Sequence, residues 1–148
     1  MTIRYLVYMV TDLHKQGLLL LRQALDNSTA NFRPGQWEAI ESLLIKLLQH
    51  LLKLKCWDKE RERNQGHWKG EIRTFRREIK KALKDSPSLK PYILEIFDEC
   101  YQDARTEASD RSQLAIDIFP FIPIGSLEQI LDENWFPEYN HNHHGKAD

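Results

Sequence analysis

The chain has 148 residues, a length at which a single domain can bury its own core without disulfides or bound metals. Its formal net charge of -1 gives no overall field that favours polyanions, so we expect neither a nucleic acid nor a membrane as its main partner. With only six glycines and six prolines, the composition favours helices over a turn-rich sheet protein.

The first segment, residues 4–26, has apolar residues at helical spacing, and Gly17 in its middle allows one helix or two shorter ones. The opening run MTIRYLVYMV is shorter than the apolar core of a signal peptide, and the later run GLLLLRQAL is shorter than a membrane span. We therefore expect a cytoplasmic protein. The polar residues 26–31 connect this segment to the next one.

Residues 37–57, WEAIESLLIKLLQHLLKLKCW, form the most apolar segment of the chain and predict its central helix. On a helix, the apolar side chains from Trp37 to Leu54 cover an arc of roughly 200°, which is wider than the usual core-facing stripe. Neighbouring elements must cover such a helix on two or three sides. We therefore expect it at the centre of a helical bundle.

A charged segment without leucine, residues 58–64, is expected to connect the central helix to a second one. In residues 67–84, HWKGEIRTFRREIKKALK, a narrow apolar seam recurs at steps of three and four on an otherwise charged helix. Pro87 ends this helix, because the residue before a proline avoids the helical region. A third helix is expected over residues 88–109, with Ser88 as its cap.

Helical periodicity stops between residues 110 and 125, where the string IDIFPFIPIG is apolar, β-branched and interrupted by two prolines. Pro120 and Pro123 disfavour a strand inside a sheet, because a proline cannot donate to the ladder. We therefore expect an extended apolar strap that lies across the bundle.

Ser126 begins the string SLEQ, which matches a capping box and predicts a short helix through Leu131 or Asp132. Residues 135–137, Trp-Phe-Pro, are expected to form an aromatic anchor behind it. Residues 138–148 contain histidines, which bind a divalent metal only weakly when nothing positions them. We expect a disordered tail there.

Together these segments predict an all-α fold: a single-domain antiparallel bundle of about four main helices over residues 1–137, with the strap and a short C-terminal helix. Short connections make neighbouring helices antiparallel. Cys56 and Cys100 lack a metal-type spacing, and we expect reduced, buried or half-buried thiols. We expect no cofactor.

Five strings of the chain follow one another in a distinctive order across residues 37–137. They are HLLK at residues 50–53, HW followed by EIRTFR, SPSLKPY, ECYQDAR and LEQILDENWFP. In these strings the chain resembles the domain-of-unknown-function 29 family of bacteria. Residues 1–33 differ from the usual N-terminal segment of the family, which is an acidic helix with a sequence similar to IEEIE. The resemblance implies an all-helical bacterial protein without an established activity, and it supplies no catalytic residues.

Charge is divided unevenly along the chain. Residues 53–84 carry twelve Lys/Arg and five Asp/Glu, whereas residues 85–148 carry four and thirteen. The basic helix at residues 69–84 and the acidic helix that follows it either pair along their edges or expose two oppositely charged surfaces. The second interpretation predicts a partner-binding surface on the basic helix. Its residues would be Arg73, Arg76, Arg77 and Lys80.

The sequence contains no phosphate-binding glycine loop, HExxH string, nucleophile elbow or paired CxxC. We therefore assign no catalytic residue and no metal ligand, and we favour a protein-interaction module whose partner is another protein or a second copy. Two alternatives stay open. Residues 69–84 would serve a nucleic-acid-binding regulator. A polar site at His50 and His67 would serve a metal-dependent enzyme if Glu60 or Glu71 supplied a third ligand.

Overall fold

The computed structural model describes residues 35–139. The chain divides into a unit over Met1–Gln36 and a unit over Trp37–Asp148, and the fold below is that of the second unit. The helix expected at residues 4–26, the polar connection after it and the histidines of the tail lie outside the described residues. The single domain expected over residues 1–137 therefore stays a prediction.

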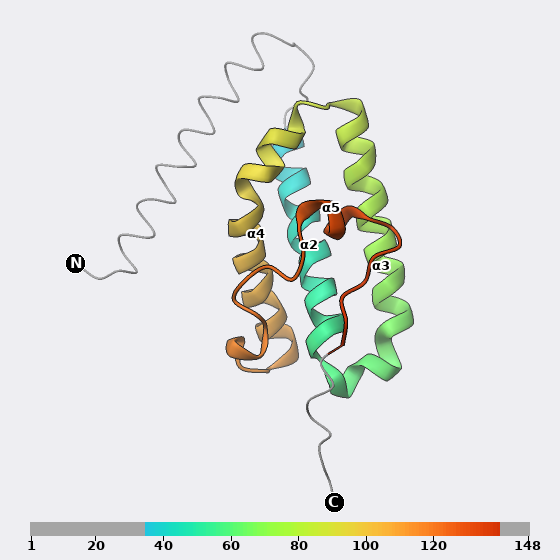
Figure 1. Ribbon diagram of the computed structural model, residues 1–148, viewed down its shortest axis with the longest axis vertical. Coiled ribbons are helices and arrows are strands. Elements are labelled where there is room, and N and C mark those ends of the chain that lie inside the picture. Colours follow the sequence, from blue (N-terminus) through green and yellow to red (C-terminus); the bar gives the residue numbers. More distant parts are fainter. Residues whose placement is uncertain (1–34, 140–148) are drawn as a thin grey trace, which may run out of the picture. The chain divides into compact units, whose positions relative to one another are not determined.

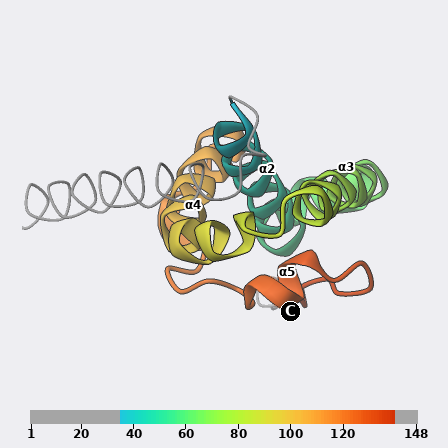
Figure 2. The same ribbon diagram turned by 90° about the horizontal axis from the view of Figure 1, so that it is seen from above.

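Three long helices and one short helix make up the described fold, and no strand occurs within residues 35–139 (Figure 1). Successive long helices run in opposite directions, and the first of them lies between the other two (Figure 1, Figure 2). The expected all-α antiparallel bundle with a short C-terminal helix is confirmed. No described helix is long and apolar enough to cross a membrane. The helices are α2 (Gln36–Cys56), α3 (Asp58–Asp85), α4 (Leu89–Ser112) and α5 (Leu127–Leu131).

The buried centre of this unit is α2, as its wide apolar arc predicts. α3 and α4 flank it, and the chain after α4 crosses a third side (Figure 2). Full burial of one leucine or isoleucine contributes about 1.5–3 kcal/mol, so this helix supplies much of the driving force for folding. Its fully enclosed apolar residues are Ile40, Leu44, Leu47, Leu48, Leu51, Leu52 and Leu54.

α3 begins earlier than the sequence pattern indicates. The expectation of a connection over residues 58–64 is wrong, because these residues form the first turns of α3 and only Trp57 separates it from α2. Lys, Arg and Glu are good helix formers, so a segment without leucine still continues a helix. The Arg61 side chain stabilises the sharp junction, since it donates to the carbonyls of Leu54 and Lys55 at 2.7 and 2.8 Å.

α4 runs to Ser112, three residues beyond its expected end. Ser88 stands at its N-cap position, as expected, but its side chain makes no capping hydrogen bond within the described chain. The strap therefore comprises residues 113–125, and it is irregular: it turns at Gln113, forms one 3-10 turn, η1, at Ile116–Ile118, and then bends repeatedly before α5. Cys56 and Cys100 are both buried thiols, as expected.

The predicted capping box is confirmed at the start of α5. The Ser126 hydroxyl accepts from the Gln129 amide at 3.2 Å, and the Gln129 side chain accepts from the Ser126 amide at 3.0 Å. Just before it, a Cβ atom on Gly125 would lie 3.0 Å from the Trp135 ring, so a larger residue would require that ring to shift. Trp135 and Phe136 hold the C-terminal segment against α3, because Arg76 donates to the Trp135 carbonyl and lies over the Phe136 ring.

Two residues of the expected tail contact the body of the unit. The carbonyl of Glu138 accepts from the Lys55 ammonium at 2.9 Å, and the Tyr139 hydroxyl donates to Gln65 at 3.0 Å. The tail prediction for residues 140–148 lies outside the described residues.

Candidate functional site

The two candidate histidines lie at different levels of the bundle. The His50 ring packs edge-on against Phe75 of α3, with ring centroids 5.2 Å apart. His67 is exposed and precedes Phe75 by eight residues, which corresponds to about 12 Å along the α3 axis. Within residues 35–139, no group of three or more His, Cys, Asp or Glu side chains is placed to hold a metal ion. The geometry of the described residues therefore does not support a metal site shared by His50 and His67.

A strip of polar side chains on α2 runs from the exposed Lys46 through the half-buried His50 to the buried Lys53. Lys46, Gln49, His50 and Lys53 follow one another at steps of three, one and three, so they share one side of the helix. Gln49 is only 2% exposed and Lys53 only 7%. His50 Nδ1 lies 2.7 Å from the Lys46 carbonyl and donates to it, which leaves Nε2 as the acceptor of the neutral ring. We call these four residues the α2 polar strip.

Two ionisable groups of this strip, His50 and Lys53, have displaced pKa values. Burial, with a smaller contribution from the charge of Lys53, lowers the pKa of His50 to about 4, although the bond to the Lys46 carbonyl and the charge of Glu71 oppose the shift. Burial, with a smaller contribution from Arg111 of α4, lowers the pKa of Lys53 to about 8. His50 is therefore neutral at pH 7, whereas most Lys53 side chains keep their charge. Displaced pKa values near a pocket mark candidate functional sites.

The pKa of His50 makes stability depend on pH. In the unfolded chain His50 takes up a proton near its ordinary pKa of 6.5, but in the folded chain only near 4. Its contribution is therefore complete above pH 6.5 and is lost as the pH falls towards 4. After allowance for solvent screening, we expect a loss of about 1–2 kcal/mol between pH 7 and pH 4. Urea denaturation across this range measures it.

The matched variants are His50→Gln and His67→Gln. His50→Gln keeps a donor for the Lys46 carbonyl and removes the titration, so its stability should depend less on pH than that of the wild type. His67 is exposed, and its replacement should leave the pH dependence as it is. Identical pH profiles for His50→Gln and the wild type would show that His50 does not carry the effect.

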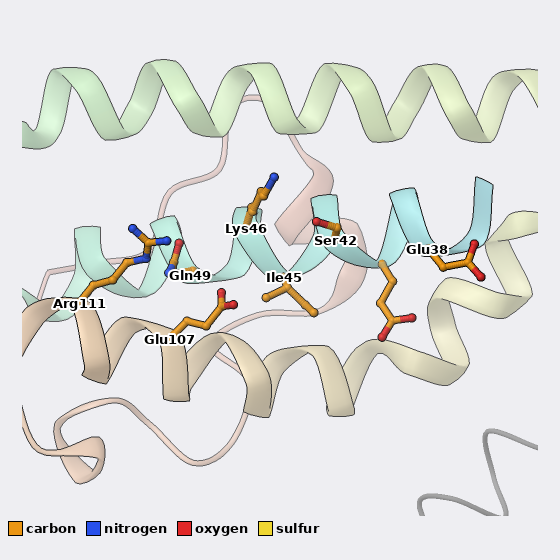
Figure 3. A pocket seen from close by; sticks show the side chains of 8 residues that line it. Glu38, Ser42, Ile45, Lys46, Gln49, Glu107 and Arg111 are labelled. Carbon is orange, nitrogen blue, oxygen red and sulfur yellow. The ribbon is translucent and has the colours of Figure 1, made fainter. Parts of the chain in front are cut away.

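A pocket of about 370 Å³ opens between α2 and α4 beside the polar strip (Figure 3). Glu38 lies at the level of the start of α2, whereas Gln49, Arg111 and Glu107 lie together towards the other end of that helix (Figure 3). The Nε2 atom of Gln49 is buried and has no hydrogen-bond partner within the described residues. The lining residues are Glu38, Glu41, Ser42, Ile45, Lys46, Gln49, Glu107 and Arg111.

The four residues of the expected partner-binding surface are divided between surface and core. Arg73, Arg77 and Lys80 are exposed on α3, whereas Arg76 is 0% exposed. The reason is its position on the apolar seam of the helix, three residues before the fully buried Ile79. The structure thus removes Arg76 from the exposed basic surface. The partner-binding role of the other three stays a prediction.

The exposed arginines of α3 meet the C-terminal segment. Arg73 and Arg77 line a second pocket of about 500 Å³ together with Glu133, Asn134 and Phe136. The Lys80 ammonium lies 3.5 Å from the Glu133 carboxylate. Within residues 35–139, no ion pair joins α3 to α4, and α2 lies between the two helices over much of their length (Figure 2). Pairing of the basic and acidic helices along their edges therefore finds no support among these residues.

The strap presents an exposed apolar surface that sequence reasoning did not resolve. Phe121 is 72% exposed and Ile122 is 76% exposed, whereas Phe119 between them and η1 is fully buried. The sequence identifies the strap as apolar, but alternation alone does not show which side chains face the bundle. We call the exposed residues the strap patch. They are Ile116, Ile118, Phe121 and Ile122.

Side chains of α4 hold the strap backbone in place. Tyr101 donates its hydroxyl to the Pro120 carbonyl at 2.6 Å, and Gln102 donates to the carbonyl of Phe121 at 3.0 Å. Arg105 donates to two further strap carbonyls. Burial raises the pKa of Tyr101 to about 12, so its hydroxyl stays a donor at any ordinary pH. The strap patch is therefore displayed on a fixed backbone.

Within residues 35–139, these features define an all-α bundle with a polar pocket beside its central helix and an exposed apolar patch on a fixed strap. The chain belongs to the family described as Domain of unknown function DUF29, whose model matches residues 31–136. The resemblance seen in the sequence is thereby confirmed. No curated protein and no solved structure matches the chain.

Proposed function

We propose that the protein is a protein-interaction module without catalytic activity and that it docks its partner through the strap patch. The observation that carries this proposal is the exposure of Phe121 and Ile122 on a backbone that α4 fixes. Contiguous exposed apolar side chains mark interaction sites, and a fixed backbone reduces the ordering cost of binding. We also infer a bacterial protein, from the family resemblance, and its cytoplasmic location stays a prediction.

The charge around the patch defines the chemistry of the partner. Residues 98–128 carry seven Asp/Glu and two Lys/Arg, a balance of -5. One of the two cations, Arg105, is buried beneath the strap, and the exposed Asp117 lies within the patch itself. A complementary partner presents apolar side chains flanked by Lys and Arg. An amphipathic basic helix meets both requirements.

A synthetic helical peptide with leucines on one face and lysines on the other should bind the full chain, and the same peptide with glutamates in place of lysines should not. Replacing Phe121 and Ile122 together by serine should lower the affinity for the lysine peptide by roughly tenfold or more, because both anchors are lost. Fluorescence anisotropy of the labelled peptides measures both effects.

Leu94→Ser is the matched control, because Leu94 is also an exposed apolar residue but lies on α4 outside the patch. It should leave the affinity unchanged. Equal binding of the two peptides, or equal binding by the double serine variant, would contradict the proposal. A wild-type dimer that the double serine variant loses would contradict it too, because the patch would then bind a second copy.

The two alternatives of the sequence stay predictions. The nucleic-acid regulator retains the exposed Arg73, Arg77 and Lys80 but not Arg76, which the fold buries. For the metal-dependent enzyme, His50 and His67 lie at different levels of the bundle and do not form a shared site among the described residues. Neither gains a specific observation that favours it over an interaction module.

A further inference from the structure

The pocket between α2 and α4 has carboxylates at one end and both signs of charge at the other, where Glu107 lies near Gln49 and Arg111 (Figure 3). Glu38 and Glu41 line one end, and Gln49 and Arg111 line the other. Glu41 and Gln49 are eight residues apart on one helix, which corresponds to about 12 Å along its axis. Ile45 lies between the two ends and gives the pocket an apolar contact. This arrangement does not involve the strap patch.

The donor end contains a buried group that lacks an acceptor. Gln49 is only 2% exposed, and its Nε2 atom has no partner within residues 35–139. Buried polar atoms are nearly always paired, so an unpaired donor at a pocket is a specific sign of a missing acceptor. The cations Lys46 and Arg111 line the same region, and Lys53 lies one turn further along α2. A carboxylate satisfies both the donor and the cations.

The other end is built to hold a cation. The Tyr92 hydroxyl donates to the Glu41 carboxylate at 3.3 Å and helps to fix its position. Glu38 lines the same end, and Glu107 of α4 also lines the pocket, one turn before Arg111. Three carboxylates would repel a simple anion, whereas Lys46 and Arg111 would repel a simple cation. The lining therefore matches a ligand with both charges.

We propose that this pocket binds a small zwitterion whose carboxylate meets Gln49 and Arg111, whose ammonium meets Glu41, and whose apolar stem covers Ile45. The volume of about 370 Å³ lies at the lower end of the usual range for small-molecule sites. The class of ligand is an ω-amino carboxylate or a compound with the same two groups.

The probes are 6-aminohexanoate, hexanoate and hexylamine, titrated into the full chain by isothermal calorimetry and by amide NMR shifts. The zwitterion should bind at least about fivefold more tightly than either single-headed probe. Gln49→Leu should weaken 6-aminohexanoate and hexanoate by roughly tenfold and leave hexylamine unchanged. Glu41→Gln should weaken 6-aminohexanoate and hexylamine in the same proportion and leave hexanoate unchanged.

Glu78→Gln is the matched control for Glu41→Gln, because Glu78 is exposed on α3 and lines neither pocket. It should bind all three probes as the wild type does. Gln49→Leu should remain folded by circular dichroism, since it removes a buried donor that lacks a partner within residues 35–139 and puts an apolar group of similar size in its place. Hexanoate or hexylamine binding as tightly as the zwitterion would overturn the proposal, and so would the absence of shifts at Gln49 and Arg111 with every probe.

Discussion

Replacing Arg76 by alanine should lower the free energy of unfolding by about 3–4 kcal/mol. The guanidinium donates to the carbonyls of Ile130 and Trp135, at 2.7 and 2.8 Å, and lies 5.2 Å from the centroid of the Phe136 ring. Alanine would leave both carbonyls without this donor and open a cavity under the C-terminal segment. Urea denaturation followed by circular dichroism measures the loss.

Arg77→Ala is the matched control, because Arg77 is the exposed neighbour on the same helix. Its stability should stay within about 0.5 kcal/mol of the wild type. Arg76→Lys should lie between the two, since an ammonium lacks the planar fork that reaches two carbonyls. A loss below about 1 kcal/mol for Arg76→Ala would mean that the C-terminal segment does not depend on this side chain.

The burial of Arg76 could in part have been predicted from the sequence. The apolar seam of residues 67–84 includes Ile72 and Ile79, and Arg76 stands between them at spacings of four and three. That position lies on the core-facing side of the helix. The partner carbonyls, however, lie 54 and 59 residues further along the chain, and no local pattern indicates that they will meet a guanidinium. The sequence interpretation placed Arg76 on the surface because the residue is charged, although its position on the helix faces the core.

The elements with a strong local signal were predicted well. The apolar arc of α2 indicated its central place, and the SLEQ string indicated the capping box of α5, because both depend on residues close in sequence. The start of α3 was missed because the turn at Trp57 is held by Arg61, whose side chain bonds back to α2. The pocket between α2 and α4 was missed because it depends on the packing of two helices.

The strap could be predicted only in part. Its prolines disfavour a strand, and no strand forms there, but the turns and bends that replace the expected extended form do not follow from the sequence. Its orientation follows from three donors on α4, namely Tyr101, Gln102 and Arg105, which bond to backbone carbonyls of the strap. Since a carbonyl has no sequence signature, which of the two phenylalanines is buried could not be predicted from the residues.

Replacing Arg105 by alanine should destabilise the protein by about 2–3 kcal/mol and release the strap. Its Nε and Nη2 atoms donate to the carbonyls of Phe119 and Ile116 at 3.1 and 3.2 Å, and its guanidinium lies 5.3 Å from the Phe121 ring centroid. Hydrogen exchange of the strap amides should become faster, while exchange in α2 should change only through the lower overall stability. Urea denaturation and exchange mass spectrometry measure the two effects.

Arg105→Ala also tests whether peptide binding depends on the apolar residues of the strap patch alone or also on the fixed backbone that carries them. Arg105→Ala keeps all four apolar residues of the patch but removes two of the bonds that fix their backbone. If binding depends on a fixed patch, the affinity for the lysine peptide should fall even under conditions where the variant is fully folded, because the strap must then be ordered on binding. Arg111→Ala, on the same helix and exposed, should change neither stability nor peptide affinity appreciably. Unchanged affinity in Arg105→Ala would mean that apolar content alone recruits the peptide and that the α4 donors contribute nothing to its binding.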